Sequence, residues 1–227
     1  GHVRYSTAGG GGIMNVQPFL FRTLDGMMGI AHNGNIVNAN SLKKELEENG
    51  SIFNSTSDTE VLGHLIKRET GRFVDRICKS LEKIDGAFAF VILVEDALYV
   101  ARDRYGLRPL SMGRLPSGGY MFSSETCALD IAGAEFVRDV EPGEIIRVKD
   151  GIIKSKKYTE TLPICNKLCA MEYIYFSRPD SNLDGINVHT ARKTCGKTLF
   201  EEAPVEADLV IGVPDSSISA AIGYSEA

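Results

Sequence analysis

The chain has 227 residues, of which 43% are hydrophobic and 24% charged, and its formal net charge is −5. Such a composition indicates a globular protein with room for one large or two smaller domains, and it excludes a disordered chain. The acidic excess argues against a nucleic-acid partner, and no apolar run reaches the roughly 18 residues of a membrane span. We therefore expect a protein that acts on small molecules.

The first 39 residues alternate short apolar runs with glycine and asparagine, which predicts strands and tight loops. Polar caps followed by apolar residues at helical spacing then predict three helices: residues 41–49, a helix beginning within 55–60, and residues 72–84. The first of these helices is expected to be capped by Asn40 or Ser41 and to stop at Gly50.

Residues 87–94 form a nearly continuous apolar run, which is typical of a strand covered on both faces. Residues 97–103 follow after a tight turn and predict a hairpin with that strand. Further strands, separated by proline and glycine, are predicted at 118–125, 144–148 and 151–155. Helix pairs that alternate with antiparallel hairpins favour helices packed on stacked sheets, an α+β fold.

The pattern changes after about residue 165. A helix over 188–203, an apolar strand over 207–215 and a further helix start predict an α/β order, with ligand loops at the carboxyl ends of strands. We expect one domain over residues 1–165 and the beginning of a second over 166–227. The sequence is also expected to be an internal fragment, without the start of the first domain and most of the second.

The five cysteines are an odd number at uneven spacing, which argues against a disulfide framework and favours a cytoplasmic protein. Cys78, Cys127 and Cys195 are predicted to be core thiols. Cys165 and Cys169 are separated by three residues, and taken alone they are better explained as two unrelated thiols than as metal ligands.

Three short polar segments contain residues that a fold alone does not require. Arg4 stands among apolar neighbours, where a guanidinium needs a carboxylate partner. The segment AHNGN predicts an Asn-Gly turn that presents the Gly34 N–H beside the side chain of Asn33. Asp58 stands at a predicted helix start, where the simplest role for an aspartate is that of an N-cap.

Each of these segments has a structural explanation of its own, namely a salt bridge, a hairpin turn or a helix cap. Together they provide a cation for an α-carboxylate, an anion for an α-ammonium and N–H donors for a developing oxyanion. These are the groups needed to hold glutamine while its side-chain amide is attacked.

Eight segments, in this order and spacing, resemble the glutamine amidotransferase domain of the N-terminal nucleophile hydrolase type: GHVRYSTAG, QPF, AHNGNIVN, SDTEV, DGAFAF, ARDRYGLRPL, SSETCALD and PGEI. The resemblance covers residues 1–165 and implies a four-layer αββα domain. It also implies a cysteine nucleophile at the first position of the mature chain, with its own α-amino group as general base. Because no cysteine precedes Cys78, this nucleophile is expected upstream of Gly1.

Residue by residue, the resemblance implies that Arg4 and Asp58 bind the backbone groups of the substrate glutamine. Asn33 and Gly34 would form the oxyanion hole, and Thr7 would help to orient the substrate. The segment ARDRYGLRPL is expected to be a structural strand and turn, held by Arg102, Asp103 and Arg108.

Residues 169–181 and 207–227 resemble the amidophosphoribosyltransferase family, which transfers ammonia from glutamine to phosphoribosyl pyrophosphate in the first step of purine synthesis. This resemblance implies an α/β phosphoribosyltransferase domain that uses Mg²⁺, with Ser216 contributing to the metal site. In the iron-sulfur branch of the family, Cys169 would be one of four thiolates on a [4Fe–4S] cluster. The resemblance further implies a homo-oligomer.

Two other functions stay open on the sequence alone. The chain could be the glutaminase module of another amidotransferase, for example a sugar-phosphate aminotransferase, or a catalytically dead ligand-sensing module. Because the nucleophile and a complete acceptor site are expected outside these residues, the chain by itself is expected to be inactive.

Overall fold

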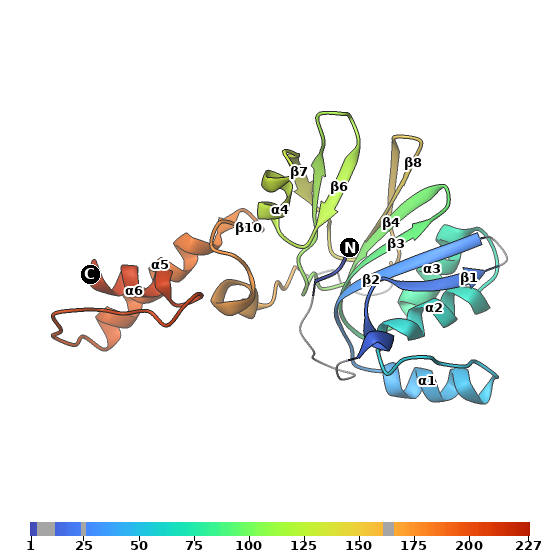
Figure 1. Ribbon diagram of the computed structural model, residues 1–227, viewed down its shortest axis with the longest axis horizontal. Coiled ribbons are helices and arrows are strands. Elements are labelled where there is room, and N and C mark those ends of the chain that lie inside the picture. Colours follow the sequence, from blue (N-terminus) through green and yellow to red (C-terminus); the bar gives the residue numbers. More distant parts are fainter. Residues whose placement is uncertain (4–11, 24–25, 161–165) are drawn as a thin grey trace. The chain divides into compact units, whose positions relative to one another are not determined.

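The computed structural model describes residues 1–3, 12–23, 26–160 and 166–227 (Figure 1). The chain divides into two compact units: residues 1–108 with 140–167, and residues 109–139 with 168–227. The domain boundary expected after residue 165 stays a prediction. Among the described residues, no helix has both the length and the apolar character needed to cross a membrane.

A six-stranded antiparallel sheet forms the centre of the first unit, in the order β1-β2-β3-β4-β8-β9. Its strands are β1 (Phe19–Thr23), β2 (Gly26–Ile36), β3 (Gly86–Val94), β4 (Ala97–Arg102), β8 (Glu144–Lys149) and β9 (Ile152–Lys157). The strands expected at 87–94, 97–103, 144–148 and 151–155 are confirmed. A short 3₁₀ helix, η1 (Ile13–Asn15), precedes β1.

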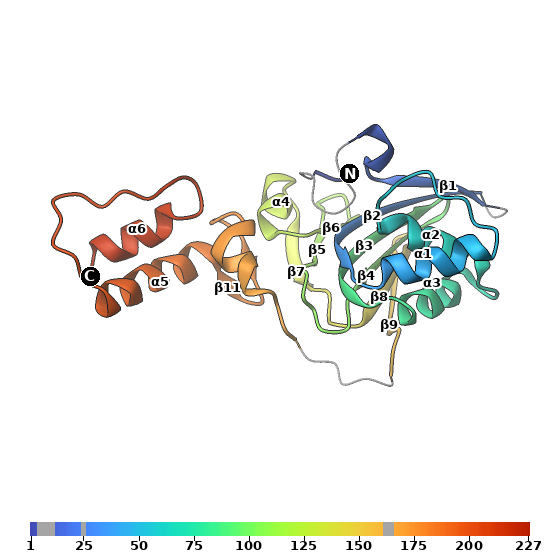
Figure 2. The ribbon, with the colours of Figure 1, turned by 90° about the horizontal axis from the view of Figure 1, so that it is seen from below.

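Three helices follow β2 in the chain and lie together beside the sheet: α1 (Ala39–Glu48), α2 (Thr59–Arg68) and α3 (Phe73–Glu82) (Figure 2). All three were expected, but α1 begins earlier than its pattern suggested, and Asn38 rather than Asn40 or Ser41 occupies the N-cap position. The Asn38 side chain bonds the Lys83 carbonyl and the Asp85 N–H, so it ties α1 to the segment after α3.

The core of this unit lies between the helices and the sheet. Leu62 and Ile66 of α2 are fully buried, as are Ile30 of β2 and Phe90 of β3. Burying such a side chain contributes about 1.5–3 kcal/mol relative to exposure. Cys78 belongs to the same cluster, which confirms its prediction as a core thiol.

The second unit contains a three-stranded sheet in the order β6-β5-β7, with helix α4 (Thr126–Ile131) beside it. The strands of this sheet are β5 (Ser111–Arg114), β6 (Tyr120–Ser123) and β7 (Glu135–Asp139). The later segment of the unit contains the π-helical turn η2 (Glu172–Phe176) and the short strand pair β10 (Asn182–Leu183) and β11 (Ile186–Asn187). It ends with the helices α5 (Val188–Glu202) and α6 (Ile218–Ser225). Only β6, α5 and α6 were expected, and the elements that were missed have at most six residues each.

Glu125 connects the two chain segments of the second unit. Its Oε2 accepts hydrogen bonds from the Arg178 N–H at 2.7 Å and the Ser181 hydroxyl at 2.8 Å. The Asn182 N–H donates to the neighbouring Thr126 Oγ1 at 2.8 Å. Cys127 is buried here, as predicted.

Two predictions for the second unit are wrong. Residues 207–215 form no strand, and Leu209, Ile211 and Val213 are exposed, because no described segment offers them a partner strand. Cys195 is exposed and not in the core. The next residue, Gly196, is the one that faces α6: a Cβ added there would lie 1.9 Å from the Ala220 carbonyl oxygen. Cys195 lies on another part of the α5 surface and is therefore exposed.

Candidate active site

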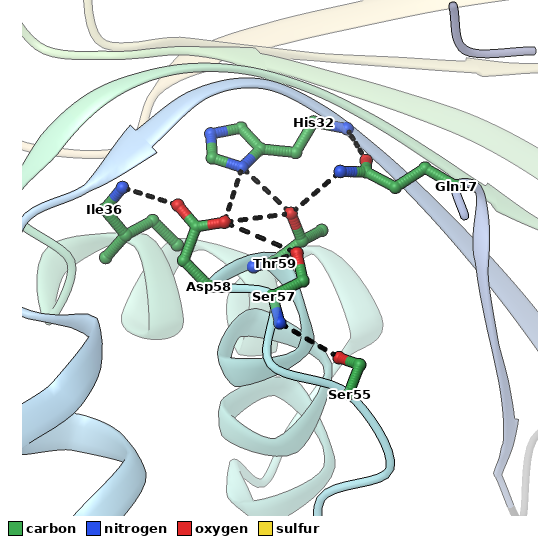
Figure 3. Close-up of polar contacts among 7 residues, drawn as sticks. All are labelled: Gln17, His32, Ile36, Ser55, Ser57, Asp58 and Thr59. Carbon is green, nitrogen blue, oxygen red and sulfur yellow. Dashed lines mark hydrogen bonds and ion pairs between the residues drawn. The ribbon is translucent and has the colours of Figure 1, made fainter. Parts of the chain in front are cut away.

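Asp58 precedes α2, and its side chain bonds the end of β2 instead of capping the backbone of the helix. It occupies the N-cap position, but its side chain makes no capping hydrogen bond. Instead its Oδ2 accepts a hydrogen bond of 2.8 Å from the backbone N–H of Ile36, at the end of β2 (Figure 3). The simple role of helix cap is therefore wrong for this carboxylate, and the start of α2 is joined to the strand.

Glu60 fixes the loop that leads into Asp58. Its carboxylate accepts hydrogen bonds from the Asn54 N–H at 2.9 Å, the Ser55 N–H at 2.8 Å and the Ser55 hydroxyl at 2.6 Å. The Ser57 hydroxyl in turn accepts from the Thr59 N–H at 3.3 Å. Short polar side chains that bond nearby backbone groups favour such turns, so residues 54–58 form a fixed loop before α2.

Asn33 and Gly34 lie within β2, where they pair with Ala89 and Phe88 of β3. The expected Asn-Gly turn is wrong, because antiparallel pairing with β3 continues through both residues to Ile36. Gly34 nevertheless has a φ of 149°, and a Cβ there would lie 2.0 Å from the Ala87 carbonyl oxygen. This position therefore requires glycine for both conformation and space.

Three buried polar side chains that the sequence interpretation did not select lie beside Asp58. The Gln17 Oε1 accepts a 2.7 Å hydrogen bond from the His32 N–H, and its Nε2 donates to the Thr59 hydroxyl at 3.2 Å. The same hydroxyl lies 3.0 Å from His32 Nδ1 and 3.4 Å from Asp58 Oδ1 (Figure 3). The motifs QPF, AHNGN and SDTEV contain these residues, but the sequence does not indicate that they meet.

The His32 ring is uncharged at neutral pH. It stacks on Phe90 with 4.4 Å between the ring centroids, and burial lowers the pKa of His32 from 6.5 to about 4. The Asp58 carboxylate, with Oδ1 at 3.8 Å from Nδ1, opposes this effect and does not overcome it.

Asp58 consequently has no cationic partner among the described residues. Its side chain is 15% exposed, and the only basic group that the described part of the chain brings within 4.0 Å is the neutral His32. A largely buried carboxylate of this kind can bind a cation or a strong hydrogen-bond donor. Arg4 and Thr7, the other expected substrate ligands, lie outside the described residues.

Comparison with known proteins shows the family of the chain. Residues 7–130 match the family model for the glutamine amidotransferase domain, which is more than half of the chain. The chain belongs to the glutamine amidotransferase domain family. The expected α+β class, with a domain of the N-terminal nucleophile hydrolase type, is thereby confirmed.

Amidotransferase relatives match over the whole chain. An amidophosphoribosyltransferase of Bacillus subtilis (strain 168) is 58% identical over 230 residues, covering 100% of this chain and 48% of the relative. One of Staphylococcus aureus (strain Mu50) is 52% identical over 227 residues, covering 100% of this chain and 46% of the relative. The chain spans about half the length of the curated relatives it matches.

A solved structure shows the same similarity in three dimensions. The glutamine phosphoribosylpyrophosphate amidotransferase from B. subtilis, complexed with ADP and GMP, has a TM-score of 0.93 and 55% identity to this chain. The match covers 99% of this chain and 48% of the solved one.

Two of the residues expected to hold the ARDRYGLRPL segment of this amidotransferase domain, Arg102 and Asp103, do so with their side chains, and the expected role of Arg108 stays a prediction. Asp103 is fully buried and accepts four backbone hydrogen bonds, from the N–H groups of Phe88, Tyr105, Leu107 and Arg108. The Arg102 guanidinium is 2% exposed and donates to three carbonyls, those of Gly106, Arg108 and Val140. Both charged groups therefore organise the turn after β4.

The expected metal ligands are not gathered into a site by the described residues. No cluster of three or more His, Cys, Asp or Glu side chains suited to a metal occurs in them. Cys169 is half-buried and Ser216 half-exposed in the turn before α6, while Cys165 lies outside the described residues. A [4Fe–4S] cluster needs four thiolates, so the described residues do not form a complete site for one.

Proposed function

We propose that the chain is the glutamine-hydrolysing part, with the beginning of the phosphoribosyltransferase part, of an amidophosphoribosyltransferase. Such a protein releases ammonia from glutamine and transfers it to phosphoribosyl pyrophosphate, giving 5-phosphoribosylamine and pyrophosphate in the first step of purine synthesis. Similarity over the whole chain to relatives and a solved structure with that name supports the proposal.

The carboxylate of Asp58 carries the proposal for the substrate. It is 15% exposed, it accepts a backbone hydrogen bond from Ile36, and no lysine or arginine of the described residues lies within 4.0 Å of it, so it can accept a further hydrogen bond from a cationic ligand. The α-ammonium of glutamine would be this cation. Arg4 would bind the α-carboxylate of the same molecule, and Thr7 would help to orient it.

Asn33 and Gly34 would stabilise the reaction that follows. A thiolate attacks the side-chain amide carbon of glutamine, the carbonyl oxygen becomes an oxyanion, and the amide nitrogen takes up a proton and leaves as ammonia. Water then hydrolyses the thioester to glutamate. Donors fixed on the oxyanion typically contribute about 10²–10³ in rate. No cysteine precedes Cys78 in this sequence, so we propose that the nucleophile lies outside these 227 residues.

The second half would bind the acceptor. Mg²⁺ is commonly bound by the phosphates of the substrate together with a few protein ligands. The Ser216 hydroxyl is proposed to be one of these protein ligands. Cys169 is proposed as one thiolate of a [4Fe–4S] cluster whose remaining ligands lie elsewhere. A homo-oligomer in the cytoplasm, without a nucleic-acid partner, completes the proposal.

The test is a product assay with the natural full-length protein, glutamine and Mg²⁺. Phosphoribosyl pyrophosphate is expected to stimulate ammonia release and to yield pyrophosphate in equal amount to 5-phosphoribosylamine, and fructose 6-phosphate is expected to yield no amino sugar. Amination of fructose 6-phosphate would instead identify a sugar-phosphate aminotransferase. Glutamine binding without hydrolysis would identify a sensor.

A further inference from the structure

The Thr59 hydroxyl is the central contact of a buried polar network around Asp58. Thr59 is fully buried, and Gln17 and His32 are 7% and 3% exposed. Gln17 Nε2 donates to the hydroxyl at 3.2 Å, while His32 Nδ1 and Asp58 Oδ1 lie within 3.4 Å of it. The same Gln17 accepts from the His32 backbone, so the side chains connect β2 to the start of α2.

Every member of this network except Asp58 is uncharged. Gln17 and Thr59 do not ionise, and burial holds the pKa of His32 near 4. His2 and Arg108 also lower that pKa, while Asp58 raises it. A charged imidazole 3.8 Å from the carboxylate would pair with it and repel any ligand cation, and a neutral one leaves the negative charge available.

On the basis of the proposed function, we infer that Gln17, His32 and Thr59 are positioning residues that hold Asp58 as the recognition group for a free α-amine. The network orients the carboxylate through neutral hydrogen bonds without neutralising it. The domain consequently selects amides that carry an α-ammonium over amides that lack one.

Glutaramate provides the matching probe, because it is glutamine without the α-amine and keeps both the amide and the carboxylate. We would measure kcat and KM for ammonia release from glutamine and from glutaramate with the natural full-length protein, and with its Asp58→Asn, Thr59→Val and Thr59→Ser variants. The serine variant is the matched control, because it keeps the hydroxyl.

The unaltered protein is expected to prefer glutamine. Thr59→Val should raise KM for glutamine about tenfold with little change in kcat, as expected for a hydrogen bond to a charged group, and leave glutaramate unaffected. Thr59→Ser should keep the preference for glutamine over glutaramate. Asp58→Asn should remove most of this preference.

Several results would overturn the inference. If Thr59→Val lowered kcat/KM equally for glutamine and glutaramate, the role of Thr59 would be purely structural. The same would hold if Thr59→Val kept the preference for glutamine while Asp58→Asn abolished that preference. Failure of the unaltered protein to hydrolyse glutamine would instead overturn the proposed function, and the inference with it.

A measurement without any variant covers the case in which Thr59→Val does not fold. The ¹⁵N resonances of the His32 ring should report an uncharged imidazole from pH 8 to pH 5, with and without bound glutamine. An imidazolium at neutral pH would contradict the inference.

Discussion

The carboxylate of Asp58 and the backbone N–H of Ile36 are joined by a hydrogen bond of 2.8 Å between the start of α2 and the end of β2. Ile36 follows Gly34 by two residues on the same strand, so this bond brings the expected ammonium ligand and the expected oxyanion donors into one region of the first unit. The helix keeps its N-terminal turn without the aspartate as a cap.

Replacing Asp58 with asparagine tests the proposed site for the α-ammonium group. The amide oxygen of asparagine can still accept from Ile36, so folding should survive while the negative charge is lost. We expect kcat/KM for glutamine to fall about 10–100-fold, as for loss of a charged hydrogen bond. Asp96→Asn is the control, because Asp96 is 61% exposed and pairs with Lys149 away from this site. Equal activity of the two variants would exclude Asp58 from the site.

Gly34→Ala should damage both stability and glutamine hydrolysis. Alanine at a φ of 149°, with its Cβ 2.0 Å from a backbone oxygen, forces β2 and β3 apart. The expected cost is at least about 2 kcal/mol of unfolding free energy, measured by urea denaturation. Gly29→Ala on the same strand is the control, since the nearest atom to its Cβ is a Leu20 methyl at 3.5 Å. A fully active and stable Gly34→Ala protein would refute the assignment.

The buried His32 should make the protein less stable in acid. In the unfolded chain its pKa is near 6.5, and in the folded protein it is about 4. Between these values the unfolded chain binds a proton that the folded one does not, so stability is lost as the pH falls from 6.5 to 4, by roughly 3 kcal/mol in total. Above pH 6.5 His32 contributes no pH dependence.

Urea denaturation of the protein and its His32→Asn variant at pH 7, 6 and 5 checks this slope. The burial-lowered pKa of His64 acts in the same direction and is common to both proteins, so only the difference between them is used. Identical slopes would mean that His32 is not buried in its neutral form.

Asp103→Asn should destabilise the fold without changing glutamine recognition. Each of the two Asp103 carboxylate oxygens accepts two backbone hydrogen bonds. In asparagine, an NH₂ group replaces one of these oxygens and cannot accept from the two backbone N–H groups that point at it. Each buried donor left unpaired costs about 1–3 kcal/mol. Thermal and urea unfolding should show the loss, while KM for glutamine in the folded fraction stays constant. A changed KM at unchanged stability would contradict the structural role.

Much of the fold could be predicted because it depends on local patterns. The period of α2 and α3, the apolar run of β3 and the hairpin into β4 are properties of adjacent residues, and all agree with the structure. Short elements such as β5 and α4, with four and six residues, are too short to show a period by themselves. The strand predicted at residues 207–215 is absent, although the apolar run is clear, because such a run forms a strand only where a partner strand exists.

The sequence by itself determined which chemical groups this amidotransferase domain possesses: the aspartate, the Asn-Gly pair and the motifs that identify its family. Only the tertiary structure decided that Asp58 bonds β2 instead of capping α2, that Asn33 and Gly34 lie within a strand, and that Gln17, His32 and Thr59 meet. The side-chain contacts of Asp58, Gln17, His32 and Thr59 join residues 15 to 42 positions apart, and the strand pairs of Asn33 and Gly34 join residues 56 and 54 positions apart. Contacts over these separations depend on how the elements pack together, which no local pattern encodes.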